Sequence, residues 1–343
     1  MDVGLVGFGM VAERFHAPLI SVRPDLRLTH VVERQRRRAE ELYPEIVTLT
    51  SAQQLWESPV EIVVILTPND SHFVLAKQAL QAGKHVVVDK PFTVTTAQAD
   101  ELVELSKQVG RILTVFHNRR WDNDFLTVAR LLAANELGRL HRYECRWERF
   151  RPQTKGGWRE REGPGTGILY DLGSHMIDQL LCLFGPPKAI FCHLQSQREG
   201  TEAVDCFNWI GDYGTFQAFL SSNCLTAAPS FRFMLQGDKA TYSKGGLDPQ
   251  EDALQAGLRP GGPDWGAEPG ELWGEIHRLV EGAVKSEAVP TLAGDYPQFY
   301  LNLAETIRGR TSLKITPLQA RDVVFAIELS IESDRQGGWV SWS

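Results

Sequence analysis

In the first 120 residues of the chain, short apolar runs alternate with longer amphipathic stretches. The apolar runs predict strands at residues 3–8, 26–33, 62–66, 86–88 and 112–116. The run at 62–66 is continuous and rich in β-branched residues, which is typical of a strand buried on both faces. The amphipathic stretches predict helices at 11–22, 34–42, 71–82 and 95–109. Repeated strand–helix–strand units of this kind predict a doubly wound parallel sheet.

After about residue 120 the pattern changes to longer strand-like stretches, at 140–150, 189–197, 204–209, 215–221 and 231–235. Short turns join most of these stretches, so we expect an open, mainly antiparallel sheet. A segment rich in Gly, Pro and Asp at 245–270 predicts a long loop, of the kind that often forms a lid. Helices are expected at 126–135, 297–308 and 317–334. The predicted fold class is therefore α/β, with a parallel-sheet domain over 1–120 and an α+β domain over 121–343.

Composition narrows the class of protein. The 343 residues include 36 Lys and Arg against 43 Asp and Glu, a net charge of −7, which argues against a general binder of nucleic acid or anionic membranes. The longest apolar run is far too short to span a bilayer, and the N-terminal Met-Asp-Val-Gly lacks the basic region of a signal peptide. The five cysteines form no C-x-x-C pair and predict buried, reduced thiols. We expect a cytoplasmic protein.

The turn after the first predicted strand has a phosphate-binding pattern, Gly7-Phe8-Gly9-Met10-Val11-Ala12. Gly7 allows a tight turn, Gly9 lets the backbone approach a pyrophosphate, and Ala12 allows close helix–strand packing. Amide groups at the start of the helix then face the phosphates, so we expect Gly7, Gly9, Met10 and Val11 to bind a dinucleotide. The alternative is a turn with a purely structural role.

The acidic residue Glu33 stands 21 residues beyond Ala12, at the end of the second strand, where a carboxylate binds the adenosine ribose. Such a carboxylate favours the 2′-hydroxyl of NAD and repels the 2′-phosphate of NADP. Arg34 follows at once and is able to stack on adenine and to pair with a 2′-phosphate. The other arginines of this run, Arg36, Arg37 and Arg38, are typical of a solvated helix face.

Polar residues follow three of the predicted strands, at the edge of the sheet where chemistry gathers in parallel α/β proteins. Lys90 is expected to polarise a substrate oxygen and to hold the nicotinamide side of a cofactor, the alternative being a surface lysine. Arg119 is expected to grip substrate hydroxyls or to pair with a carboxylate. Asn118 is expected to contact both cofactor and substrate. The remaining cofactor-binding candidates at these strand ends are Thr67, Pro68, Asn69, His72 and Asp89.

A second constellation lies on a predicted helix that Gly185-Pro186-Pro187 ends. Asp171 and His175 are four residues apart and share a helix face. A carboxylate that orients an imidazole is the usual arrangement of a general base. Three alternatives stay open: Asp171 as a simple N-cap, His175 as a buried structural histidine, and a metal site formed with Asp178.

Together these motifs resemble the Gfo/Idh/MocA oxidoreductases over nearly the whole chain. Within that family the chain is most similar to the NADP-dependent scyllo-inositol 2-dehydrogenases. The segments that carry this second likeness lie at 14–20, 116–122, 149–152, 157–160, 169–175 and 246–251. Asp89-Lys90-Pro91 departs from the family's Glu-Lys-Pro by one methylene, and Glu33 departs from the pattern expected for NADP.

The resemblance implies a Rossmann domain followed by an α/β domain whose open sheet makes homo-oligomer contacts through its outer face. It implies that Lys90 binds cofactor and polarises the reacting oxygen, and that His175 is the proton acceptor coupled to Asp171. It also implies that Trp158 and Arg159 approach the cofactor from the second domain. The resemblance slightly favours NADP as the cofactor, whereas Glu33 argues for NAD.

Our leading hypothesis is an NAD(P)-dependent dehydrogenase that acts on a CH–OH group of a cyclic polyol or sugar resembling scyllo-inositol. A second hypothesis is a sugar-modifying enzyme with tightly bound NAD, acting as a transient-oxidation glycosidase or a sugar–sugar oxidoreductase. A third is a redox-sensing dinucleotide binder without catalysis, which the set of Lys90, Asp171 and His175 argues against.

Overall fold

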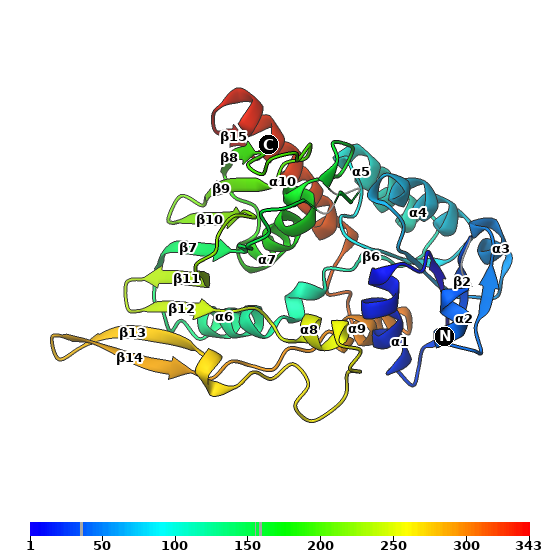
Figure 1. Cartoon of the computed structure of the whole chain (residues 1–343), viewed down its shortest axis with the longest axis horizontal. Helices are drawn as coiled ribbons and strands as arrows, with labels where there is room; N and C mark the ends of the chain where they lie inside the picture. The colour runs from blue at the N-terminus through cyan, green and yellow to red at the C-terminus, as the bar shows by residue number, and fades with distance from the viewer. Residues whose placement is uncertain (35–36, 155, 158–159) are drawn as a thin grey trace. The chain divides into compact units, whose positions relative to one another are not determined.

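The computed structural model describes residues 1–34, 37–154, 156–157 and 160–343 (Figure 1). The chain divides into two compact units. The first comprises Met1–Asn118, Gln250–Trp265 and Asp295–Val324, and the second comprises Arg119–Pro249, Gly266–Gly294 and Phe325–Ser343. The sequence-based domain limits of 1–120 and 121–343 stay a prediction.

The first unit contains a parallel sheet of six strands among the described residues, in the order β3-β2-β1-β4-β5-β6. This order, with its reversal between β1 and β4, confirms the predicted doubly wound sheet. The sequence did not predict β3. The strands are β1 (Asp2–Val6), β2 (Arg27–Val32), β3 (Val47–Leu49), β4 (Ile62–Ile65), β5 (His85–Val88) and β6 (Leu113–Val115).

The apolar runs of these strands are buried because the sheet is covered by helices. Every residue of β4 is buried, as the continuous run at 62–65 predicts. Alternate strand residues such as Val63 and Ile65 pack in one cluster with Leu80, Leu102 and Val324 from three helices. The helices and short helical turns of this unit are η1 (Ala12–His16), α1 (Ala17–Ser21), α2 (Arg38–Leu42), α3 (Ala52–Glu57), η2 (Asn69–Ser71), α4 (His72–Gln81), α5 (Thr96–Gln108), α8 (Gln250–Gln255) and α9 (Pro297–Ile307).

Two helices of the first unit differ from their predictions. The helix predicted at 11–22 is a π-helical segment, η1, that continues directly into α1. The helix predicted at 34–42 is shorter, because α2 begins at Arg38. The predicted 245–270 loop contains α8. Gly245 ends a strand of the second unit, Gly270 begins a short helical turn, and the rest of the segment is neither helix nor strand.

The second unit contains a sheet of nine strands among the described residues, in the order β14-β13-β12-β11-β7-β10-β9-β8-β15. All its neighbouring pairs are antiparallel except β7 and β10, so the prediction of a mainly antiparallel sheet is confirmed. The sequence did not predict β12 to β15. The strands are β7 (Leu140–Arg146), β8 (Ala189–Gln195), β9 (Cys206–Asp212), β10 (Gln217–Ser222), β11 (Phe231–Gly237), β12 (Thr241–Gly245), β13 (Gly274–Val280), β14 (Ala283–Val289) and β15 (Val340–Ser341).

Helices α6 (Asn123–Ala133) and α7 (Ser174–Phe184) cover one face of this sheet (Figure 1). The ring of Phe184 packs edge-on against Tyr143 of β7, with 5.5 Å between centroids. Helix α10 (Pro317–Gln336) begins in the first unit and ends in the second. It is tied to the sheet by the Trp209 indole, which donates to the Ser330 hydroxyl at 3.0 Å. The remaining short turns are η3 (Asn118–Trp121), η5 (Leu169–Gly173) and η6 (Gly270–Leu272).

The cysteines are free thiols, as predicted, but burial holds for four of the five. Cys145, Cys192, Cys206 and Cys224 are buried, whereas Cys182 on α7 is exposed. Within the described parts of the chain, no helix is long and apolar enough to cross a membrane.

Candidate active site

A pocket of about 690 Å³ opens at the carboxyl ends of the parallel strands in the first unit. This volume lies within the usual range for a small-molecule or cofactor site. Among the predicted cofactor-binding residues, it brings together Gly7, Glu33, Arg34, Thr67 and Pro68. The pocket is also lined by residues that were not predicted to bind the cofactor: Val6, Phe8, Val32, Ala52, Asp70, Ser71, Val74 and Leu75.

Gly7 and Gly9 of the first turn are each favoured over other residues for a different structural reason. Gly7 has a φ of +97°, and a Cβ added there would lie 3.0 Å from the carbonyl oxygen of Leu66. Gly9 has open space around its Cα, with no atom within 4 Å of an added Cβ. A backbone that is bare at Gly9 and followed by a helix suits the close approach of a pyrophosphate. Met10 is 59% exposed beside it, and Val11 is the residue before η1.

Glu33 and Arg34 lie at the end of β2 and line the same pocket. One carboxylate oxygen of Glu33 accepts a hydrogen bond of 3.2 Å from the backbone N–H of Ala39, near the start of α2. This bond fixes the side chain, as a carboxylate at a helix N-terminus is favoured there. Arg34 is exposed, while Arg37 and Arg38 pair with Glu40 and Glu13 at 3.4 and 3.2 Å. Arg36 lies outside the described residues.

Two strand-end loops are joined by His72, which is fully buried. Its Nδ1 lies 2.8 Å from the carbonyl oxygen of Pro91, and its Nε2 lies 2.9 Å from that of Thr67. Burial lowers the pKa of His72, against the raising effect of Asp89 and the two carbonyl groups. Because no part of His72 is exposed, any effect on cofactor binding acts through the loops that it joins. Asn69, on the intervening turn η2, is 9% exposed.

Asp89 and Lys90 follow β5 directly, with the Asp89 carboxylate 13% exposed. Burial acts to raise the pKa of Asp89, but the neighbouring His16 and the charge of Lys90 hold it below its ordinary value. His16 is fully buried; its Nε2 lies 3.8 Å from Asp89, and its Nδ1 lies 2.5 Å from the Tyr300 hydroxyl. Asp89, directly before Lys90 in the chain, is therefore a carboxylate whose charged form is favoured and which lies against the buried His16.

Asp171 and His175 lie in the second unit, where η5 runs into α7. The N-cap of α7 is Gly173, and Asp171 lies inside η5, so Asp171 is not the N-cap of this helix. His175 is 6% exposed, and its ring centroid lies 6.0 Å from that of Trp147. Asp178, the third member of the metal alternative, instead binds Arg120 through both oxygens, at 2.7 and 2.9 Å. This pairing argues against Asp178 as a metal ligand.

Trp147 is the centre of an aromatic and cationic cluster that the sequence did not predict. The guanidinium carbons of Arg119 and Arg232 lie 4.6 and 4.7 Å from its ring. Gln179 on α7 joins both arginines, because its amide donates to the Arg119 carbonyl at 2.7 Å and accepts from Arg232 at 3.1 Å. The structure therefore brings Arg119 and His175 together around one ring. Trp147 lies one residue past the end of β7 and follows the buried Tyr143 and Cys145 at a spacing of two residues. This alternation is the signal that could have indicated its burial.

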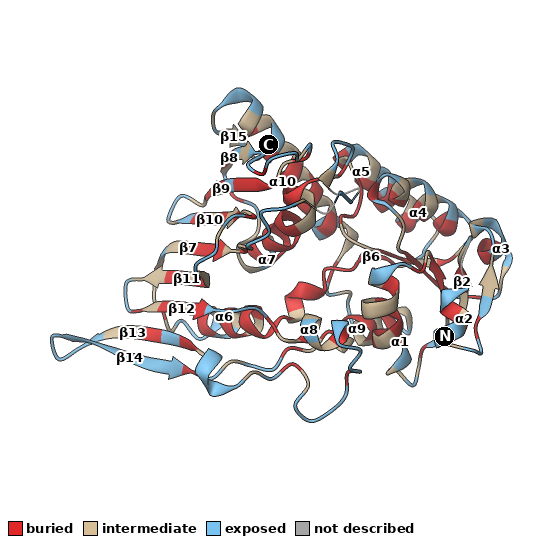
Figure 2. Ribbon diagram, in the orientation of Figure 1, coloured by how far each residue is buried: buried red, intermediate tan, exposed pale blue. Residues whose placement is uncertain are grey.

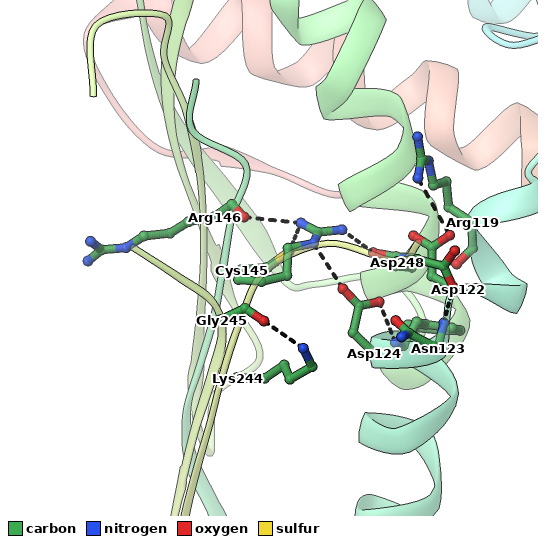
Figure 3. Close-up of polar contacts among 12 residues, drawn as sticks. Arg119, Asp122, Asn123, Asp124, Cys145, Arg146, Lys244, Gly245 and Asp248 are labelled. Atoms are coloured by element: carbon green, nitrogen blue, oxygen red, sulfur yellow. Dashed lines mark hydrogen bonds and ion pairs between the residues drawn. The ribbon is translucent and has the colours of Figure 1, made fainter. Parts of the chain in front are cut away.

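Arg119 belongs to a group of buried charged residues in the second unit, whose polar contacts Figure 3 shows. Arg119 pairs with Asp122 at 3.6 Å, and the neighbouring Asn123 N–H donates to Asp248 at 2.6 Å. The Asp124 carboxylate lies 3.4 Å from Arg232, which also donates to the Cys145 sulfur at 2.9 Å. Lys244 and Glu268 pair at 3.1 Å in the same unit. Buried charges of this kind fix positions because each needs its partner.

The remaining predicted site residues are divided between the two units of the chain. Asn118, at the end of the first unit, is 4% exposed. Lys90 belongs to the first unit, and Arg119, Asp171 and His175 belong to the second. Trp158 and Arg159 lie outside the described residues. All the site assignments stay predictions.

Two family models match the chain. One describes the NAD-binding Rossmann fold of the Gfo/Idh/MocA oxidoreductases and matches residues 1–117, and the other describes their C-terminal α/β domain and matches residues 129–342. The chain belongs to the Gfo/Idh/MocA oxidoreductase family. It is therefore an oxidoreductase with an NAD-binding Rossmann fold, as the sequence resemblance implies.

Relatives of known sequence match nearly the whole chain. The oxidoreductase YdgJ of Escherichia coli is 43% identical over 96% of this chain and 95% of its own length. IolW of Bacillus subtilis, named a scyllo-inositol 2-dehydrogenase (NADP(+)), is 36% identical over 98% of this chain and 94% of its own length. Among solved structures, the oxidoreductase YvaA of Bacillus subtilis has a TM-score of 0.97 at 35% identity, covering 100% of this chain and 98% of that one.

Proposed function

We propose that the protein is an NAD(P)-dependent dehydrogenase acting on a CH–OH group of a cyclic polyol or sugar similar to scyllo-inositol. The observation that carries this proposal is the pocket formed by Gly7, Glu33, Arg34 and Thr67 at the carboxyl ends of a parallel sheet. Support for the substrate class comes from the likeness to IolW over 98% of this chain. The enzyme is proposed to act in the cytoplasm, which suits its free thiols.

In this proposal, the open backbone at Gly9 and the helix after it hold the pyrophosphate, and Glu33 or Arg34 binds the adenosine ribose. Asp89, Asn118, Trp158 and Arg159 complete the cofactor site. When bound, the nicotinamide supplies the acceptor for the hydride that leaves the carbinol carbon.

His175 takes the hydroxyl proton of the substrate, and Asp171 acts as a positioning residue that keeps the imidazole in the useful tautomer. The Lys90 ammonium stabilises negative charge that develops on the substrate oxygen. Asn118 and Arg119 bind substrate hydroxyls, with Arg119 held in place by Trp147 and Asp122. Copies of the chain associate through the outer face of the nine-stranded sheet.

The substrate class is tested with a panel of inositols and aldoses, each assayed with NAD and with NADP. We expect turnover of at least one inositol with exchangeable cofactor. Mass spectrometry of the freshly purified protein is the companion measurement, because stoichiometric NAD that does not exchange would favour the sugar-modifying alternative. A panel without turnover, combined with an empty and exchangeable cofactor site, would contradict the dehydrogenase proposal.

Glu33→Gln is expected to weaken NAD binding about five- to tenfold and to tighten NADP binding. The amide still accepts the hydrogen bond from Ala39, but it loses the charge that strengthens a bond to a ribose hydroxyl and that repels a 2′-phosphate. Calorimetric titration of both cofactors measures the change. Glu40→Gln is the matched control, since Glu40 on α2 pairs with the preceding Arg37 and does not line the pocket. Equal cofactor affinities in Glu33→Gln and wild type would mean that Glu33 does not contact the ribose.

A further inference from the structure

Strand β14 forms one edge of the nine-stranded sheet, and among the described residues no strand pairs with its outer side. Six of its seven residues are exposed, and Figure 2 shows it pale along most of its length. The β13–β14 hairpin extends past the ends of the neighbouring strands (Figure 1). Exposed edges of this length pair readily with another strand unless something covers or disrupts them.

The hairpin has a well-defined register. Its two-residue loop, Glu281-Gly282, has φ angles of +53° and +81°, which are typical of a type I′ turn. The turn pairs Val280 with Ala283 and Leu279 with Val284. This register decides which β14 side chains share a face.

The hairpin exposes apolar side chains on one face. Leu279 and Val284 are 72% and 73% exposed, and they share that face because they are directly opposite in the ladder. Apolar side chains with this exposure are typical of an interaction surface, because a second strand beside them would remove apolar area from water.

The sequence of β14, Ala-Val-Lys-Ser-Glu-Ala-Val, is self-complementary about its central residue, Ser286. If two copies pair antiparallel with Ser286 opposite Ser286, each Lys285 lies opposite Glu287 of the other copy. Val284 then lies opposite Ala288, on the face that also carries Ser286, so one face is charge-matched and the other is uncharged. Among the described residues, these charges have weak partners within one chain: Lys285 lies 3.8 Å from the exposed Glu281, and Glu287 lies 3.6 Å from the half-buried Arg278.

We propose that β14 is an interface with a second copy of this chain, in which two β14 strands pair antiparallel about a two-fold axis at Ser286. A two-fold contact closes on itself, so it joins two sheets edge to edge without forming fibres. This interface is separate from contacts through the outer face of the sheet, and it is independent of the proposed function.

A disulfide trap tests the register directly. In a Cys182→Ser background, which removes the exposed thiol, Ser286→Cys is expected to form covalent dimers on mild oxidation, because only the residue on the axis meets itself. Lys285→Cys and Glu287→Cys are the matched controls. Each alone is expected to cross-link poorly, and an equimolar mixture of the two is expected to cross-link well. Ser286→Cys that forms no more dimer than its background would overturn the proposal.

Charge reversal gives a second, independent measurement. Lys285→Glu sets like charges opposite each other twice and is expected to weaken self-association about tenfold in sedimentation velocity. The same reversal at Glu287, Glu287→Lys, is expected to act alike, and the double variant Lys285→Glu/Glu287→Lys is expected to restore association. If outer-face contacts also hold copies together, the single variants are expected to break only the β14 contact. The largest assembly then dissociates into smaller ones that the outer-face contacts still hold together. Association unaffected by the single variants, or unrestored in the double one, contradicts the pairing.

Discussion

His175→Ala is expected to lower kcat by about 10²- to 10⁴-fold with the true substrate, the usual contribution of a positioned general base. The loss follows from the proposed role of the imidazole as acceptor of the hydroxyl proton. Because a histidine base works only when neutral, wild-type kcat/KM for oxidation is expected to fall on the acid side, and the variant is expected to lose that limb of the profile. Added imidazole is expected to restore part of the rate.

Lys90→Ala is expected to cause a similar loss of kcat, because it removes the charge that stabilises the developing oxyanion. Unlike His175→Ala, it is expected to keep the acid limb of the pH profile and to gain nothing from imidazole. Asp171→Asn, which changes a positioning residue, is expected to reduce kcat with little change in KM. These different signatures separate the three proposed roles.

Matched controls are available for both replacements. His141 on β7 is exposed, and Lys107 on α5 is 61% exposed and pairs only loosely with Glu104, at 3.7 Å. His141→Ala and Lys107→Ala are expected to leave kcat within about twofold of wild type. If His175→Ala and Lys90→Ala also keep wild-type kcat, the catalytic assignment is wrong.

The sequence predicted the elements whose burial is strong and regular. The runs in β4 and β5 are buried over nearly their whole length, so their apolar pattern is continuous. The β13–β14 hairpin was missed for the opposite reason. Its residues are mostly exposed on both faces, so its sequence shows no apolar alternation, and its Glu-Gly turn lacks the usual Asn-Gly or Asp-Gly signal.

The candidate site divides in the same way. The pocket residues Gly7, Glu33 and Thr67 were predictable because the carboxyl ends of parallel strands meet at one edge. The cluster around Trp147 was not, because it depends on tertiary contacts between residues far apart in the chain. Arg232 on β11 lies 4.7 Å from the Trp147 ring, just beyond β7, and the antiparallel pairing of β11 with β7 that brings these segments together is specified by no local pattern.

Breaking the Arg120–Asp178 pair is expected to destabilise the folded protein strongly, because each partner is buried. Its side chains are 7% and 1% exposed, and two hydrogen bonds of 2.7 and 2.9 Å join them. Burial acts to lower the pKa of Arg120, but the charge of Asp178 raises it above its ordinary value. Arg120→Leu, which removes the guanidinium that both oxygens of this buried carboxylate bind, is therefore expected to lower the free energy of unfolding by about 3–5 kcal/mol.

Asp178→Leu is expected to cost a similar amount, since it removes the carboxylate that pairs with a buried guanidinium, whereas Arg120→Leu/Asp178→Leu is expected to recover most of the loss. The matched control is Arg335, which binds Glu332 through the same two-bond geometry, at 2.7 and 2.8 Å, but is 72% exposed. Arg335→Leu is expected to leave the free energy of unfolding nearly unchanged, because water screens the pair and solvates the partner left behind. Urea unfolding of all four variants separates the effects. A double variant as unstable as the sum of its singles would mean that the two side chains contribute by packing and not as an ion pair.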